Sequence, residues 1–70
     1  MENVEKIKVE MIAIKDKVDA SDRLEAMKKF ACHHETVSRY LRGEVKKEAF
    51  GLKLLGFLKE RIATREKALA

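Results

Sequence analysis

The 70-residue chain contains no proline and only three glycines, so few of its residues interrupt a helix. Its single cysteine, Cys32, excludes an internal disulfide and is typical of a protein in a reducing compartment. No run of apolar residues approaches the roughly 20 that a transmembrane helix needs. The N-terminal residues also lack the basic stretch and apolar run of a secretory signal. These absences predict one soluble, cytoplasmic, largely helical domain spanning residues 1–70.

Charge is plentiful and unevenly placed. Charged residues make up 40% of the chain, and Lys and Arg outnumber Asp and Glu by 16 to 12, which gives a formal charge of +4. The charges nearly cancel before Asp22, whereas basic residues clearly outnumber acidic ones from Arg23 onward. The basic part of the chain permits an acidic partner without identifying one.

Apolar residues recur at three- and four-residue spacing in the first part of the chain, which predicts two amphipathic helices. The first helix is expected over 3–18, with Val4, Ile7, Met11, Ile14 and Val18 on its apolar side. The second is expected from Asp22 to Phe30 or Ala31, with Ser21 as its N-cap. Its expected buried side consists of Leu24, Met27, Phe30 and Ala31.

The stretch Glu35-Thr36-Val37-Ser38-Arg39-Tyr40-Leu41-Arg42-Gly43 predicts a short third helix over about 33–42. Val37, Tyr40 and Leu41 give it one apolar side, and its arginines face elsewhere. Gly43 can adopt the left-handed conformation that ends a helix. A last helix is expected from about residue 48 or 51 to 69. Within it, Gly51 and Gly56 each cost about 1 kcal/mol relative to alanine, which suggests a helix start at Gly51 or a close approach of another backbone.

The run from Thr36 to Gly43 resembles the second half of a helix-turn-helix of the Cro and phage-repressor (lambda repressor-like) type, and TVSR occurs in related helices of the lac-repressor family. The resemblance covers about 22–43. It implies an all-α bundle of four to five helices with a long C-terminal helix. The family usually has a small residue, often alanine, at the fifth motif position. Counting back from Val37 places Met27 there and Ala26 one place early, so either the two helices cross at a wider distance or the turn is one residue longer.

The resemblance further implies a transcriptional regulator of phage or mobile-element origin that binds double-stranded DNA. The helix at 33–42 would enter the major groove, where a glutamate can accept from cytosine and an arginine can pair with guanine. The residues expected to contact bases are His33, His34, Glu35, Ser38 and Arg39. Those expected to contact phosphate are Arg23, Lys28, Lys29, Thr36, Arg42, Lys46 and Lys47. The alternative for Arg39 is an ion pair on a solvated surface, and for Glu35 it is an acid that favours the helix start.

Other kinds of site find little support. Cys32, His33 and His34 are adjacent, so they do not readily converge on one tetrahedral metal ion, and no second Cys/His cluster completes a site. No Gly-rich phosphate loop or pair of catalytic carboxylates is present. We therefore expect no enzymatic activity, no cofactor, no metal and no small-molecule substrate.

Two further expectations concern partners. Leu55, Leu58, Ile62 and Leu69 are spaced so that they could form a modest seam between two C-terminal helices in a homodimer. The main alternative to DNA binding is a helical protein-interaction module, an adaptor or an antitoxin-like protein, that uses the same fold to bind a protein. An acidic residue at the exposed front of the third helix favours that alternative, and Glu35 is such a residue.

Overall fold

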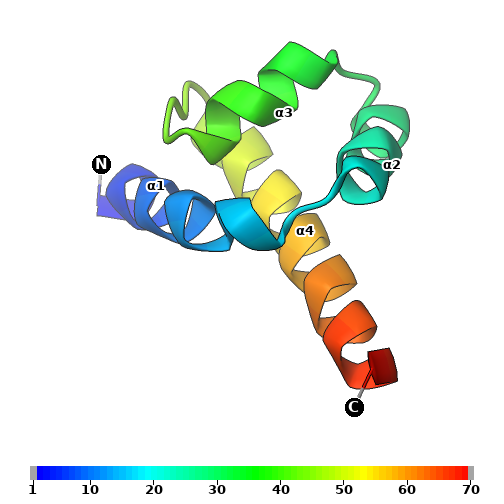
Figure 1. The fold of residues 1–70 in the computed structure, drawn as a ribbon. Helices are drawn as coiled ribbons and strands as arrows, with labels where there is room; N and C mark the ends of the chain where they lie inside the picture. The colour runs from blue at the N-terminus through cyan, green and yellow to red at the C-terminus, as the bar shows by residue number, and fades with distance from the viewer. Residues whose placement is uncertain (1, 70) are drawn as a thin grey trace.

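The computed structural model describes the backbone of residues 2–69 and the side chains of residues 3–69. Within this range the chain forms four α-helices and one short 3-10 helix, so the expected all-α fold is confirmed. None of these helices is both long and apolar enough to cross a membrane. Helix α1 lies across α4, and the C-terminal part of α4 extends beyond the other helices (Figure 1). The elements are α1 (Glu2–Ile14), η1 (Lys15–Lys17), α2 (Ala20–Phe30), α3 (His34–Leu41) and α4 (Glu48–Leu69).

The first helix is shorter than the sequence predicts. It ends at Ile14, and the chain then makes the 3-10 turn η1. Val18 follows in an extended conformation, with φ −82° and ψ 120°. It is nevertheless 7% exposed, because the extended link turns its side chain into the core. The apolar spacing that includes Val18 therefore reflects burial of this residue and not continuation of the helix.

The second helix begins at Ala20 with Asp19 as its N-cap, so the prediction of Ser21 at that position is wrong. The Asp19 carboxylate accepts from the backbone N–H of Asp22 at 2.9 Å, and the Asp22 carboxylate accepts from the backbone N–H of Asp19 at 3.1 Å. This reciprocal pair satisfies two N–H groups that would otherwise lack partners. Asp19 can serve because its backbone is extended, whereas Ser21 is already inside the helix.

Asp22 also joins α2 to the distant end of the chain. Its side chain is 0% exposed and lies between two arginines of α4. Arg61 Nε donates to one carboxylate oxygen at 2.8 Å, and Arg65 Nη1 donates to the other at 2.8 Å. Burial alone raises the pKa of Asp22, but the hydrogen bonds from Arg61, from the Asp19 amide and from Arg65 outweigh it and hold the pKa below its usual value. Arg65 also donates to the Lys17 carbonyl, so one ionic cluster fixes the start of α2 against α4.

This cluster changes which side of α2 is buried. Leu24, which the apolar pattern places in the core, is 49% exposed, while Asp22 and Ala26 are fully buried. Met27 is only partly buried against the core. The helix ends at Phe30, and its C-cap, Ala31, has left-handed φ 50° and ψ 49°. Ala26, one position before Met27, is therefore the small residue that α2 buries.

The third helix, α3, lies within one residue of its predicted bounds at each end. Gly43 follows it with φ +92° and donates its N–H to the Tyr40 carbonyl at 3.0 Å. The next amide, of Glu44, donates to the Arg39 carbonyl at 2.9 Å. These two hydrogen bonds form a Schellman motif, and they confirm the predicted role of Gly43 in ending the helix.

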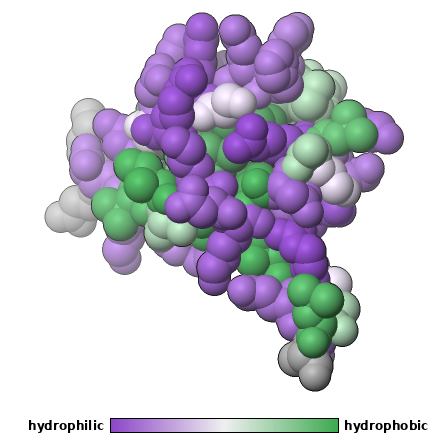
Figure 2. All heavy atoms as spheres, in the orientation of Figure 1, coloured by the Kyte–Doolittle hydropathy of each residue, from purple (hydrophilic) through white to green (hydrophobic). Residues whose placement is uncertain are grey.

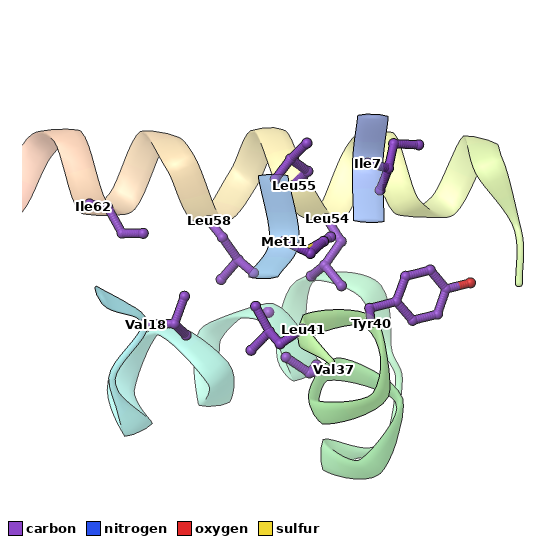
Figure 3. Packing of buried hydrophobic residues seen from close by; sticks show 11 residues of the cluster. Ile7, Met11, Val18, Val37, Tyr40, Leu41, Leu54, Leu55, Leu58 and Ile62 are labelled. Carbon is purple, nitrogen blue, oxygen red and sulfur yellow. The ribbon is translucent and has the colours of Figure 1, made fainter. Parts of the chain in front are cut away.

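The core lies where α1, α3 and α4 meet. In Figure 3, Leu54 and Leu58 of α4 point toward Leu41 of α3, and all three side chains are 0% exposed. The proposed dimer seam is wrong for three of its four residues, because those three face this core. The residues concerned are Leu55, Leu58 and Ile62, which are 5, 0 and 5% exposed, whereas Leu69 is 83% exposed.

Aromatic rings connect α2 and α3 to α4. Phe30 of α2 meets the rings of Phe50 and Phe57 of α4 edge-on, each at a centroid distance of 5.6 Å. Phe50 meets Tyr40 of α3 in the same way at 5.1 Å. Gly51 lies inside α4, so it does not start the helix. A Cβ at Gly51 would lie 3.1 to 3.5 Å from side-chain atoms of three neighbouring residues, which explains the absence of a larger residue there.

Replacing Gly56 with alanine is expected to raise the free energy of unfolding by about 0.5 to 1 kcal/mol. A Cβ at this position meets no atom within 4 Å, so the helix preference of alanine is not offset by a clash. Urea unfolding followed by circular dichroism measures the change. Gly43→Ala is the matched comparison and should destabilise, because its φ is +92° and its Cβ would lie 3.2 Å from Ile12 Cδ1. A loss of stability in Gly56→Ala would contradict the open surroundings of this residue.

Candidate functional site

The third helix has one buried side and one exposed side. Val37, Tyr40 and Leu41 are 0, 5 and 0% exposed and fix α3 to the core. Figure 1 places α3 along the upper edge of the molecule, with α1 and α4 beneath it. In Figure 2, which has the same orientation, hydrophilic residues cover this edge. The outer side of α3 therefore faces solvent.

Glu35, Arg39 and Arg42 form a stripe along the outer side of α3. They are four and three residues apart, so they share one side of the helix. That side is opposite the one that carries Val37 and Tyr40, by the same periodicity. The side chains of the stripe are 67, 47 and 54% exposed in chain order. A surface that approaches α3 therefore meets one carboxylate and two guanidinium groups first.

Four further predicted residues lie beside this stripe. His33 precedes α3 in an extended conformation, and it and His34 are both exposed. Ser38 and Thr36 are half-buried at the borders of the exposed side. Four of the five residues predicted to contact bases are therefore exposed, either at the start of α3 or on its outer side. The fifth, Ser38, is half-buried.

Both arginines of the stripe have carboxylate neighbours. Arg39 Nη2 lies 3.8 Å from a Glu35 carboxylate oxygen, one helical turn away. Arg42 Nε donates to Glu44 in the following turn at 3.3 Å. The ion pair considered for Arg39 is therefore present, on a side chain that is also exposed to solvent. Such surface pairs contribute only about 0.2 to 1 kcal/mol, so a phosphate or a base can replace the carboxylate.

Two lysines follow α3 in the loop before α4. Lys46 and Lys47 are exposed, and neither forms an ion pair with any side chain of residues 3–69. The backbone N–H of Lys47 donates to the Tyr40 hydroxyl at 2.9 Å, which holds the loop to α3. The apolar spacing of α3 predicts a core position for Tyr40 but not this hydrogen bond. Tyr40 is the one tyrosine of the chain. A tyrosine at a buried position indicates that its hydroxyl has a hydrogen-bond partner, because a buried phenol normally has one.

The structure places the predicted phosphate contacts of α2 differently. Lys28 is exposed and lies 3.8 Å from Glu25. Lys29 lies over the Phe57 ring of α4, 5.7 Å from its centroid, in an open groove lined by residues of α2, α4 and Asp19 but none of α3. Arg23 is half-buried, and its Nε is enclosed without a hydrogen-bond partner among the described residues. Lys29 therefore lies toward α4, and Arg23 is less accessible than the exposed groups of α3.

Cys32 lies in the turn before α3 and is half-buried against the core. Burial raises the pKa of its thiol, which makes the nucleophilic thiolate rarer at neutral pH. The rings of His33 and His34 lie 5.7 Å apart. Across residues 2–69, no three His, Cys, Asp or Glu residues are grouped so that they could hold a metal ion.

Comparisons of the chain with protein-family models, with curated proteins and with solved structures find no match. Only the side chains of the site therefore indicate its function. Around α3 these offer guanidinium and ammonium donors, two imidazoles and one prominent carboxylate. Such a set suits a partner that carries many negative charges and, beside them, hydrogen-bond donors and acceptors.

Proposed function

We propose that this domain binds double-stranded DNA through a helix-turn-helix formed by α2 and α3, with α3 in the major groove, and acts as a transcriptional regulator. The observation that carries the proposal is the exposed stripe Glu35, Arg39 and Arg42, on a helix whose other side is buried. The major groove admits one helix and presents donors and acceptors on the base edges. The stripe offers partners for both kinds of group.

The charge around α3 supports the same proposal. The exposed side of α3 and the loop after it carry four basic residues, Arg39, Arg42, Lys46 and Lys47, against two acidic ones, Glu35 and Glu44. Each of the two acids lies within 4 Å of one of these arginines, at 3.8 and 3.3 Å. Lys46 and Lys47 are held next to α3 by the hydrogen bond to Tyr40, where they can contact phosphates that flank the groove. Such contacts supply affinity that depends strongly on salt and little on sequence.

Fluorescence anisotropy with a pool of random-sequence DNA duplexes, measured across a salt series, tests DNA binding. We expect binding at about 50 mM salt that weakens linearly on a log–log plot as salt rises. Lys46→Ala should reduce the slope of this plot by about one, because one phosphate contact is lost. Arg39→Ala should also weaken binding.

Lys6→Ala is the matched control, since Lys6 is an exposed lysine of α1 far from the stripe in sequence. It should leave both the affinity and the salt slope close to those of the wild type. Absence of binding at low salt would refute the proposal. So would binding that neither Arg39→Ala nor Lys46→Ala alters.

A homodimer remains part of the proposal, because helix-turn-helix regulators commonly bind two half-sites about one helical turn apart. If α4 forms the contact, it must use its exposed side, where Leu52 and Leu69 are 50 and 83% exposed. Sedimentation equilibrium at micromolar concentration should then give about twice the chain mass. A single species of 8.1 kDa would contradict the dimer.

A protein-interaction module is the second candidate. Glu35 favours it, because this carboxylate is 67% exposed at the front of α3 and would be repelled by phosphates. In an antitoxin-like protein both functions would coexist, with α3 on DNA and α4 on a protein partner. A protein that fails to bind duplex DNA at low salt, while remaining folded by circular dichroism, would favour the pure interaction module.

A further inference from the structure

The carboxylate of Glu35 is the feature of the α3 surface that simple attraction to DNA does not explain. It stands first in the exposed stripe, and its side chain is 67% exposed. It belongs to the segment 23–47, which is the most basic part of the chain. Between two rows of phosphates its charge opposes binding to every sequence alike, since affinity for DNA of any sequence comes from neutralising phosphates.

A carboxylate in the major groove is favourable only where a base offers it a hydrogen-bond donor. The exocyclic amino groups of cytosine and adenine are the donors available there. Arg39 has the complementary requirement, because its guanidinium pairs at two atoms only with the O6 and N7 acceptors of guanine. Their four-residue spacing places these two side chains next to each other on α3, with charged atoms 3.8 Å apart.

The G·C base pair matches this arrangement. Its edge presents the two guanine acceptors next to the amino donor of cytosine, so donors and an acceptor on α3 meet acceptors and a donor on the DNA. An A·T pair offers an amino donor as well, but its two acceptors, adenine N7 and thymine O4, are not adjacent and do not fit one guanidinium. Only a G·C pair therefore satisfies the carboxylate of Glu35 and the guanidinium of Arg39 together.

We propose that Glu35 is a specificity-determining residue that, together with Arg39, makes tight binding conditional on a G·C pair beneath α3. This inference depends on the proposed DNA binding. It assigns opposite effects to one side chain: Glu35 weakens binding to DNA of arbitrary sequence and strengthens binding to a duplex that carries the correct base pair.

The test is a selection from duplexes with a randomised core, carried out with the wild type, Glu35→Gln and Glu25→Gln. The wild type should enrich sequences with one strongly preferred G·C position. Glu35→Gln should shift that position toward A·T, because a glutamine amide pairs with adenine at two atoms. It should also bind the unselected random pool about three- to tenfold more tightly at low salt, because one repelling charge is removed. Glu25→Gln is the matched control, since Glu25 also lies 3.8 Å from a basic partner, Lys28, but on α2.

Unchanged base preference and unchanged affinity for the random pool in Glu35→Gln would overturn the role of Glu35 while leaving DNA binding intact. The same shift in Glu25→Gln would also overturn it, because the effect would then follow from net charge alone. Failure of the wild type to bind any duplex at low salt is a different result, and it removes the proposed function together with this inference.

Discussion

Asp22→Ala is expected to lower the free energy of unfolding by about 3 kcal/mol, at the lower end of the range for breaking a buried ion pair. Asp22 is fully buried, and its loss leaves Arg61 and Arg65 without their shared carboxylate. The arginine side chains are 33 and 34% exposed, so they can turn partly toward water, which limits the loss. For a chain of this length the melting temperature should fall by roughly 15 °C. Thermal and urea unfolding followed by circular dichroism measure both quantities.

Asp16→Ala serves as the control for this substitution, since Asp16 is an exposed acid in the 3-10 turn just before α2. It should change stability by no more than about 0.5 kcal/mol. An equally small effect of Asp22→Ala would show that the ionic cluster contributes nothing to holding α2 against α4.

The carboxylate of Asp22 should also make the free energy of unfolding depend on pH in the acid range. The pKa of Asp22 is lowered in the folded state, so the unfolded chain binds this proton more readily. Its contribution is therefore present above the unfolded pKa of about 3.9 and is lost as the pH falls below that value through the lower folded pKa. In Asp22→Asn this part of the acid dependence should be absent. Urea unfolding at a series of pH values between about 3 and 7 makes the comparison.

Leu54→Ala is the second large effect and should lower the free energy of unfolding by about 2 to 5 kcal/mol. Leu54 is 0% exposed where α4 meets α1 and α3, so its removal leaves a cavity that the surrounding helices fill only partly. Leu52→Ala is the matched control on the same helix. Leu52 is 50% exposed, and its loss should change stability by less than about 1 kcal/mol. Similar losses in both variants would contradict the orientation of α4 on the core.

Much of this architecture could be predicted from local sequence. The bounds of α3 and α4 follow from apolar spacing, and the end of α3 follows from Gly43. These features depend on residues within one or two helical turns of each other, and such short-range patterns can be read directly from a sequence. The exposed position of Arg39 follows for the same reason, since it lies opposite the apolar side of its own helix.

The incorrect predictions concern contacts between residues that lie far apart in the sequence. The apolar pattern predicts a buried Leu24, whereas the structure buries Asp22 and leaves Leu24 49% exposed. The partners that reverse this, Arg61 and Arg65, lie 39 and 43 residues away, so no local pattern reveals them. Leu58 was misassigned to a dimer seam because an apolar stripe on a helix looks the same whether it meets another subunit or the core of its own chain.

The position of Lys29 illustrates a further limit. Adjacent lysines look equivalent in a sequence, yet they lie on different sides of a helix. Lys28 pairs with Glu25 at 3.8 Å, whereas Lys29 turns toward Phe57 of α4. A helix rotates each successive side chain by about 100°, and only the packing of α2 decides which of the two lysines turns toward α4.

The hydrogen bond from the Lys47 amide to Tyr40 ties the loop that carries two lysines to α3. The tyrosine ring is buried in the core, so the loop is held at a fixed place beside the helix. If the domain binds DNA as proposed, a shift of α3 by one base pair along the groove carries Lys46 and Lys47 by the same step along the phosphates. Because phosphates are equivalent from one base pair to the next, only the side chains of α3 would then distinguish one alignment from another.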